Sequence, residues 1–206
     1  MRQRIVDALA ASPASRGLPE AGAAGPSEGY PGYIRPPPAG PTGDKDAAVL
    51  IPLHETADGI SVILTERAAH LARHPGQVAF PGGRIEQRDL SPHYAALREA
   101  EEEIGLESRR VEIVGTLNRQ RTGTGFLVTP VVGFFTGPFK PRPDPNEVAA
   151  VFSVPLDFLL NPINCERTSF RDRGRAIRTF EIQWQQWRIW GATAHIIVAF
   201  RDLITI

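Results

Sequence analysis

The chain has 206 residues, enough for one domain with a substantial core, and its apolar and charged fractions of 42% and 22% are those of an ordinary globular protein. Lys plus Arg equals Asp plus Glu, at 23 each, so no net charge attracts the chain to nucleic acid or to an acidic membrane. No apolar run reaches the roughly 20 residues of a membrane span. The lone Cys165 excludes an internal disulfide and favours a reducing compartment. We expect a cytoplasmic protein with a small, buried thiol at Cys165.

Residues 1–45 are predicted to precede the compact domain, which we place at residues 46–206. Ile5, Val6 and Leu9 give the first residues a short apolar helical stripe. Proline and glycine are so frequent over residues 13–44 that no regular element can persist there. We interpret residues 13–44 as an extended arm.

From residue 46 onward, apolar runs bounded by turn residues predict a sheet. The runs 47–53 and 60–67 form a hairpin with Asp58-Gly59 in its turn, and 77–80 is a third short strand. Further strands are predicted at 111–117, 128–135, 147–154, 166–170, 178–184 and 187–191. These strands, with a few helices between them, predict an α/β or α+β sandwich built on a mixed sheet.

Two helices are predicted within this domain. The first runs from Pro92 to Ile104, because Ser91 suits the N-cap and Gly105 suits the left-handed C-cap. The second closes the chain at about residues 192–202, where apolar residues recur with helical spacing.

The first of these helices carries an unusually acidic run, "REAEEEIGL" at 98–106. Residues three and four apart share a helical face, so Glu99, Glu102 and Glu103 are predicted to converge, with Glu101 turned away. Taken alone, such a face is most often merely solvated. The preceding Pro81-Gly82-Gly83, interpreted as the end of a strand and the start of a loop, allows close approach of backbone to a ligand. Loop and helix together predict a Mg²⁺ site that presents the metal to a diphosphate.

Gly83, Asp89 and the run 98–106 resemble the Nudix box, which reads Gly, five spacers, Glu, seven spacers, then Arg-Glu-apolar-x-Glu-Glu-x-Gly-apolar. The second half matches at every fixed position. In the first half, Asp89 replaces Glu and eight residues separate it from Arg98. Glu86 is a second acid that can reach the same place. In both respects the sequence resembles the coenzyme A diphosphatase branch of Nudix hydrolases, which also has this Asp and the extra spacer.

The stretch "LTERAAHLARHPGQVAFPGG" at 64–83 also resembles a signature of that branch, with Ala68 where the branch has Ser and Ala72 where it has a second Arg. The resemblance covers about residues 46–204. It implies a Nudix-type α/β/α sandwich with a mixed sheet. It further implies Mg²⁺- or Mn²⁺-dependent hydrolysis of coenzyme A, or of its acyl derivatives, to 4′-phosphopantetheine and adenosine 3′,5′-bisphosphate.

Roles for single residues follow from the same resemblance. Glu99 and Glu103 are the expected principal metal ligands, and Glu102 is a third ligand or the general base. Glu147 is a second candidate base, although it could instead cap the turn before it. Arg98 is expected to orient a neighbouring acid. Expected substrate contacts are made by Arg67, Arg73, Phe80, Gly82 and Gly83, with the two arginines available for a phosphate such as the 3′-phosphate of coenzyme A.

Other interpretations stay open at this point. The substrate could be another nucleoside diphosphate such as NADH or ADP-ribose, or the domain could bind without catalysis. His70 and His74 have a spacing that can bind metal on a helix, but no third ligand is evident, which favours a loop role. Trp184, Trp187 and Trp190 could stack on adenine, although core packing or a homodimer interface is more common for such aromatics.

Overall fold

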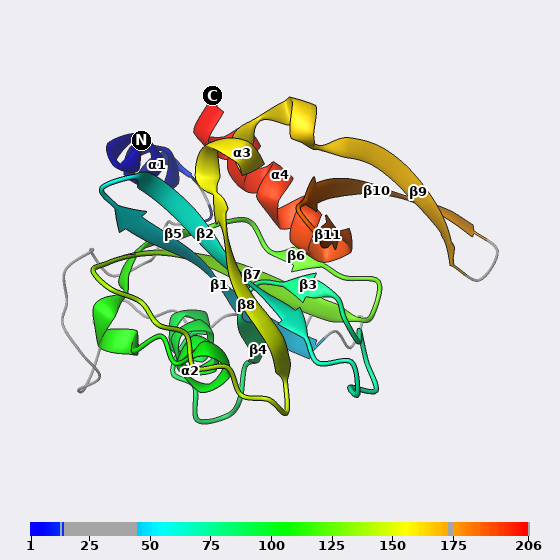
Figure 1. Cartoon of the computed structure of the whole chain (residues 1–206), viewed down its shortest axis with the longest axis horizontal. Helices are drawn as coiled ribbons and strands as arrows, with labels where there is room; N and C mark the ends of the chain where they lie inside the picture. The colour runs from blue at the N-terminus through cyan, green and yellow to red at the C-terminus, as the bar shows by residue number, and fades with distance from the viewer. Residues whose placement is uncertain (13, 15–44, 173–174, 206) are drawn as a thin grey trace.

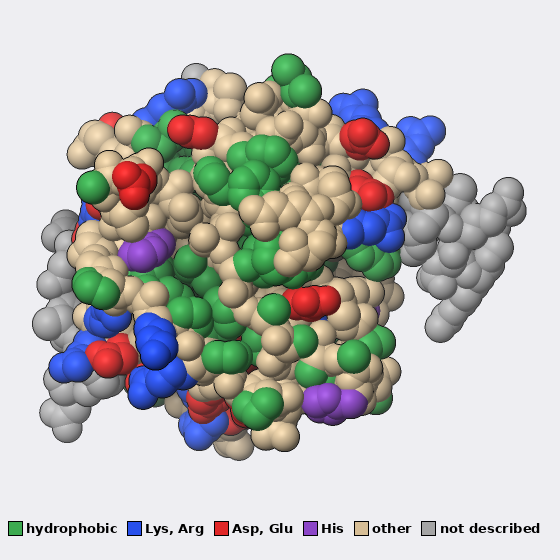
Figure 2. Space-filling model, viewed as in Figure 1, with side chains coloured by type: hydrophobic (Ala, Val, Ile, Leu, Met, Phe, Trp, Pro, Cys, Tyr) green, Lys and Arg blue, Asp and Glu red, His purple; other side chains and the backbone are tan. Residues whose placement is uncertain are grey.

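The structure, a computed structural model, describes residues 1–12, 14, 45–172 and 175–205. The arm predicted at 13–44 lies outside these described residues, apart from Ala14. None of the described helices has the length and apolar composition of a membrane span. Acidic and basic side chains are interspersed on the face shown in Figure 2, in keeping with the balanced charge of the sequence.

Eight strands form the main sheet, in the order β3-β2-β1-β7-β5, with β4 beside β1, β6 beside β7 and β8 beside β2. The long central pair β1–β7 is parallel and the other pairs are antiparallel, so the sheet is mixed, as predicted. The strands are β1 Lys45–Thr56, β2 Gly59–Arg67, β3 Val78–Ala79, β4 Gly82–Arg84, β5 Glu112–Thr116, β6 Gln120–Arg121, β7 Phe126–Thr136 and β8 Val148–Pro155.

Helices cover both faces of this sheet, which confirms the predicted α/β/α sandwich (Figure 1). Helix α2 (Pro92–Ile104) packs on one face, where alanines on the helix and in β1 allow close contact. The other face is covered by α1 (Arg2–Ala11), α3 (Leu156–Leu160) and α4 (Gly191–Thr205), over a larger core rich in Ile, Leu, Val and Phe. Two short 3₁₀ turns lie at Ser108–Arg110 and Pro162–Asn164.

A second, three-stranded sheet was not foreseen as separate. Its order is β11-β10-β9, from β9 Glu166–Asp172, β10 Arg175–Trp184 and β11 Trp187–Trp190, and the β9–β10 pair extends away from the body in Figure 1. Trp184 and Trp187 pack against the larger core, and the Trp187 ring stacks on Phe152 at 3.8 Å. Core packing is therefore confirmed for these two tryptophans.

Both ends of helix α2, Pro92 and Ile104, lie where the capping residues predicted them. The Ser91 hydroxyl accepts a hydrogen bond from the Tyr94 amide, and Gly105 ends the helix at φ 70°. The region just before the helix was predicted less well. The third strand shortens to Val78–Ala79, and Gly82–Arg84 is a strand of its own rather than a loop, because its backbone pairs with residues 47–49 of β1.

Helix α1 is part of the packed body although the sequence places it before residue 46. Ile5 and Leu9 are completely buried in the larger core, and Arg2 forms ion pairs with Glu55 of β1 and Glu112 of β5. The boundary at residue 45 itself remains a prediction. Cys165, expected to be buried, is partly buried and packs against the larger core.

Candidate active site

Two glutamates of helix α2 point toward the glycine strand β4. The Gly82 amide donates a hydrogen bond of 3.1 Å to Oε2 of Glu103, a side chain that is only 4% exposed. Gly82 adopts φ 155°, and a Cβ at this position would lie 2.4 Å from the carbonyl oxygen of Ala48 in β1. Only glycine can therefore bring this amide close to both β1 and the helix.

Glu99 lies one helical turn before Glu103 and faces Gly83. A Cβ on Gly83 would come within 2.6 Å of the Glu99 carboxylate, so the missing side chain leaves the room that the carboxylate occupies. The two glycines predicted to contact substrate thus have a demonstrable role toward the acids, one by donating a hydrogen bond and the other by its small size. Their contact with substrate remains a prediction.

The surroundings of Glu99 and Glu103 disfavour a negative charge on both carboxylates at once. Burial, with the nearby charges of Glu99 and Glu147, raises the pKa of Glu103 to about 8. Burial also raises the pKa of Glu99, with Glu102 and Glu147 adding to the effect and Arg98 opposing it. A divalent cation between the carboxylates would remove this repulsion.

Arg98 organises the acids on the outer side of the helix. Its guanidinium donates to both oxygens of Asp89 at 3.0 and 2.9 Å, and it is also within 2.9 Å of Glu99 and 2.8 Å of Glu102. Burial alone would raise the pKa of Asp89, but the bonds from Arg98 and from the Glu86 amide hold that pKa below its usual range. Asp89 is therefore a partner of Arg98, which agrees with the expected orienting role of Arg98.

Glu102 does not join the other two glutamates as fully as its spacing predicted. Its side chain is 53% exposed and is held by Arg98 and, at 3.5 Å, by Arg88. The reason is that two arginines compete for it on the solvent side. Glu101 faces away, as predicted, and accepts hydrogen bonds from the amide and hydroxyl of Ser108. The metal or base role of Glu102 remains a prediction.

The turn at residues 142–147 brings Glu147 to the site. The amides of Arg142 and Asp144 donate to the carbonyl oxygens of Ile104 and Glu103, at 2.9 and 3.0 Å, and so satisfy carbonyls at the end of α2. The turn is capped by the Asp144 side chain, which accepts from Asn146 at 2.9 Å, and not by Glu147. Glu147 remains available as the third carboxylate whose charge acts on Glu99 and Glu103.

Arg67 ends strand β2 beside this turn. It pairs across the sheet with Val148, and its positive charge acts on Glu103. Its Nε atom is buried and has no hydrogen-bond partner among the described residues. Since buried donors are nearly always paired, the unpaired Nε of Arg67 is unusual in the site.

The remaining predicted contacts divide between surface and core. Arg73 is exposed in the loop 68–77 between β2 and β3. Phe80 is buried at 4% exposure in the larger core, where its side chain packs, and its expected contact with substrate remains a prediction. His70, in the same loop as Arg73, lies 3.1 Å through its Nε2 from the Asn146 carbonyl oxygen.

The donors present fit a hard divalent cation. Glu99 and Glu103 offer carboxylate oxygens in a partly desolvated place, and Mg²⁺ commonly takes only one or two carboxylates and completes its shell with water and substrate phosphates. Within the described residues, no three His, Cys, Asp or Glu side chains form a ready-made cage. The arrangement therefore suits a metal that is shared with a phosphorylated substrate.

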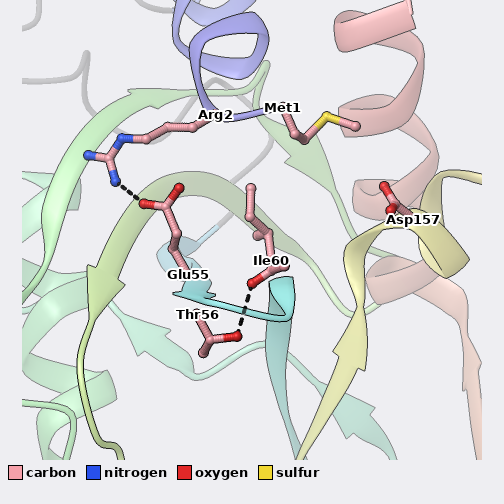
Figure 3. Close-up of a pocket in the computed structure, with 7 residues that line it drawn as sticks. Met1, Arg2, Glu55, Thr56, Ile60 and Asp157 are labelled. Carbon is pink, nitrogen blue, oxygen red and sulfur yellow. Dashed lines mark hydrogen bonds and ion pairs between the residues drawn. The ribbon is translucent and has the colours of Figure 1, made fainter.

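A cavity of about 250 Å³ lies away from these carboxylates (Figure 3). It is lined by Met1, Arg2, Glu55, Thr56, Gly59, Ile60 and Asp157. Thr56 stands at the β1–β2 turn, eight residues along β1 from Ala48, and a strand of that length spans roughly 26 Å. The carboxylates beside β4, and not this cavity, form the candidate active site.

Comparison with known proteins identifies the fold and the class of chemistry. A family model described as the NUDIX domain matches residues 44–172. The chain belongs to the Nudix family. An Enterobacter relative named "Uncharacterized Nudix hydrolase NudL" is 42% identical over 153 residues, which cover 74% of this chain and 79% of the relative. The relative of the same name from Escherichia coli K12 is 40% identical over the same shares of the two chains.

Among solved structures, the Nudix hydrolase RenU from M. smegmatis is 25% identical over 56% of this chain and 73% of its own, with a TM-score of 0.48. Nudix hydrolases cleave the diphosphate of a nucleoside linked to another group and generally use divalent metal ions, so the chain is an enzyme of this class. The family membership accounts for the convergence of Glu99 and Glu103 on the glycine strand.

Proposed function

We propose that this Nudix enzyme hydrolyses the diphosphate of coenzyme A, or of its acyl derivatives, to 4′-phosphopantetheine and adenosine 3′,5′-bisphosphate. The observation that carries the proposal is the approach of Glu99 and Glu103 to Gly82-Gly83, with the charge of Glu147 acting on both glutamates. The signature at 64–83, which precedes these glycines, supports coenzyme A as the substrate.

Mg²⁺ or Mn²⁺, held by Glu99 and Glu103 with Glu102 as the outer candidate, would neutralise charge on the diphosphate and lower the pKa of a coordinated water. The hydrogen bond from the Gly82 amide to Oε2 fixes the orientation of the Glu103 carboxylate. Glu147, on the exposed turn, is the group available to accept a proton from the attacking water. Arg67, whose positive charge acts on Glu103, would donate from its guanidinium to a phosphoryl oxygen.

The substrate proposal is tested with a panel of coenzyme A, acetyl coenzyme A, NADH and ADP-ribose, each incubated with Mg²⁺ or Mn²⁺ and analysed by mass. We expect coenzyme A to give the two named products with the highest kcat/KM. A clear preference for ADP-ribose or NADH would favour the other substrate class, which the alanine at position 72 also suits. Absence of turnover with every member would support a binding module.

Dephospho-coenzyme A separates the roles of the two arginines, because it lacks only the 3′-phosphate. If Arg73 binds that phosphate, Arg73→Ala raises KM for coenzyme A and leaves KM for dephospho-coenzyme A unchanged. Arg67→Ala is expected to impair both substrates equally, since the diphosphate is common to them. Equal effects of Arg73→Ala on the two substrates would remove Arg73 from the proposal.

A further inference from the structure

The position of Glu147 depends on the turn at residues 142–147. Residues 145–147 are exposed, and two prolines at 143 and 145 leave the turn with fewer backbone donors. One side of the turn is fastened to helix α2 through the Asp144 amide and the Glu103 carbonyl. On the other side, the Glu147 and Val148 amides donate to the Asp144 carbonyl at 3.0 and 2.8 Å, and one further attachment links this side to a neighbouring loop.

That attachment comes from the loop 68–77. The Ala68 amide donates to the Glu147 carbonyl at 2.8 Å, and the His70 ring reaches the preceding carbonyl, that of Asn146, at 3.1 Å. A carbonyl oxygen can only accept, so Nε2 of His70 carries the hydrogen. Two successive carbonyls are thus held by one loop, immediately where a bulge between Glu66 and Arg67 shifts the β2–β8 register. Bulges of this kind redirect side chains beside active sites.

We propose that His70 is a positioning residue, which holds the turn at Asn146 and thereby keeps the Glu147 carboxylate beside Glu99 and Glu103. The inference rests on the proposed catalytic role of Glu147. It gives a function to a histidine whose spacing from His74 suggested a metal ligand, because its ring is directed at a backbone carbonyl instead.

Kinetics of matched variants test this role with coenzyme A and Mg²⁺. His70→Ala should lower kcat about three- to tenfold, the effect of losing one hydrogen bond, with a smaller change in KM. His70→Gln should restore most of kcat, because its amide can donate from a similar distance. His74→Asn is the control, since His74 is an exposed neighbour in the same loop at φ 57°, a conformation that asparagine tolerates.

The double variant distinguishes positioning of Glu147 from a general effect on the loop. When Glu147 is already Gln, His70→Ala should cause little further loss, since the carboxylate it positions is gone. Equal losses in both backgrounds, an unimpaired Glu147→Gln enzyme, or no rescue by His70→Gln would overturn the inference.

Hydrogen exchange gives a readout that is independent of turnover. His70→Ala should speed amide exchange over residues 144–148, whereas His70→Gln and His74→Asn should not. Unchanged exchange in His70→Ala would contradict the positioning role even if kcat fell. A wild-type enzyme that hydrolyses no member of the panel would instead refute the proposed function, and the exchange experiment would still decide whether His70 holds the turn.

Discussion

Gly83 and Glu99 are so close that a Cβ on the glycine would lie 2.6 Å from the carboxylate. We expect Gly83→Ala to displace Glu99, and with it the metal, and to lower kcat strongly at modest cost in stability, because the end of a side chain can move. Gly82→Ala would instead meet the backbone of β1 at φ 155° and should cost about 1–3 kcal/mol or more in unfolding free energy. Urea denaturation and kcat measured on both variants check this contrast, and equal stability losses would contradict it.

Replacement of Glu103 by Gln should remove a metal ligand while the fold stays intact. We expect activity to fall by at least about a hundredfold, a loss larger than that for typical outer-shell groups of metal sites. The metal-free variant should melt no lower than the wild type at pH 7, since burial raises the pKa of Glu103 to about 8 and makes its charge costly. Glu101→Gln, on the opposite side of α2, is the control. Unchanged turnover in Glu103→Gln would refute the metal assignment.

Arg98→Ala should destabilise the protein as well as the site. The variant leaves Asp89, whose side chain is 4% exposed, without its partner, and breaking such a buried pair typically costs about 3–5 kcal/mol. Arg98→Lys should recover only part of the lost unfolding free energy. An ammonium cannot bridge both oxygens of Asp89 and also reach Glu99 and Glu102. Denaturation of Arg98→Ala in an Asp89→Asn background should show a smaller loss, and an undiminished loss there would argue against the pair.

Stability should fall below neutral pH partly through His93, in the first turn of α2. Burial lowers the pKa of His93 to about 4 from a usual value of 6.5. The unfolded chain therefore binds a proton first, so this contribution to stability is complete above pH 6.5 and is lost as the pH falls toward 4. Urea denaturation of the wild type and of His93→Gln across this pH range measures the contribution of His93. Parallel curves of unfolding free energy against pH for the two proteins would rule this contribution out.

Helix α1 should contribute to stability despite the long segment between it and β1. Leu9→Ala is expected to lower the unfolding free energy by about 2–5 kcal/mol, because Leu9 is completely buried. Arg4→Ala, on the exposed side of the same helix, should change stability by less than about 0.5 kcal/mol. Similar melting temperatures for Leu9→Ala and Arg4→Ala would mean that α1 is dispensable.

The parts of this fold that the sequence predicts best are those encoded within a few residues. Ser91 and Gly105 mark the ends of α2 because a cap needs only its own turn. Strand β4 was missed because glycines have little strand preference, and its pairing is imposed by β1 more than 30 residues earlier.

In the candidate site, too, some residues are predicted by local sequence and others are placed by long-range contacts. Spacing alone places Glu99 and Glu103 on one face, and the resemblance to the Nudix box then identifies that face as a candidate metal site. The exposed position of Glu102 depends on Arg88, and the approach of Glu147 depends on amides that reach back about 40 residues to the end of α2. Such long-range contacts have no local signal in the sequence.

Contact between α1 and α4 has a consequence for how the chain is synthesised. Helix α1 contacts α4, the last helix of the described residues, and β1 finds its parallel partner β7 only after residue 126 has been made. Contacts this distant along the chain slow folding. Nascent chains stalled before α4 should therefore expose Ile5 and Leu9 and depend on chaperones.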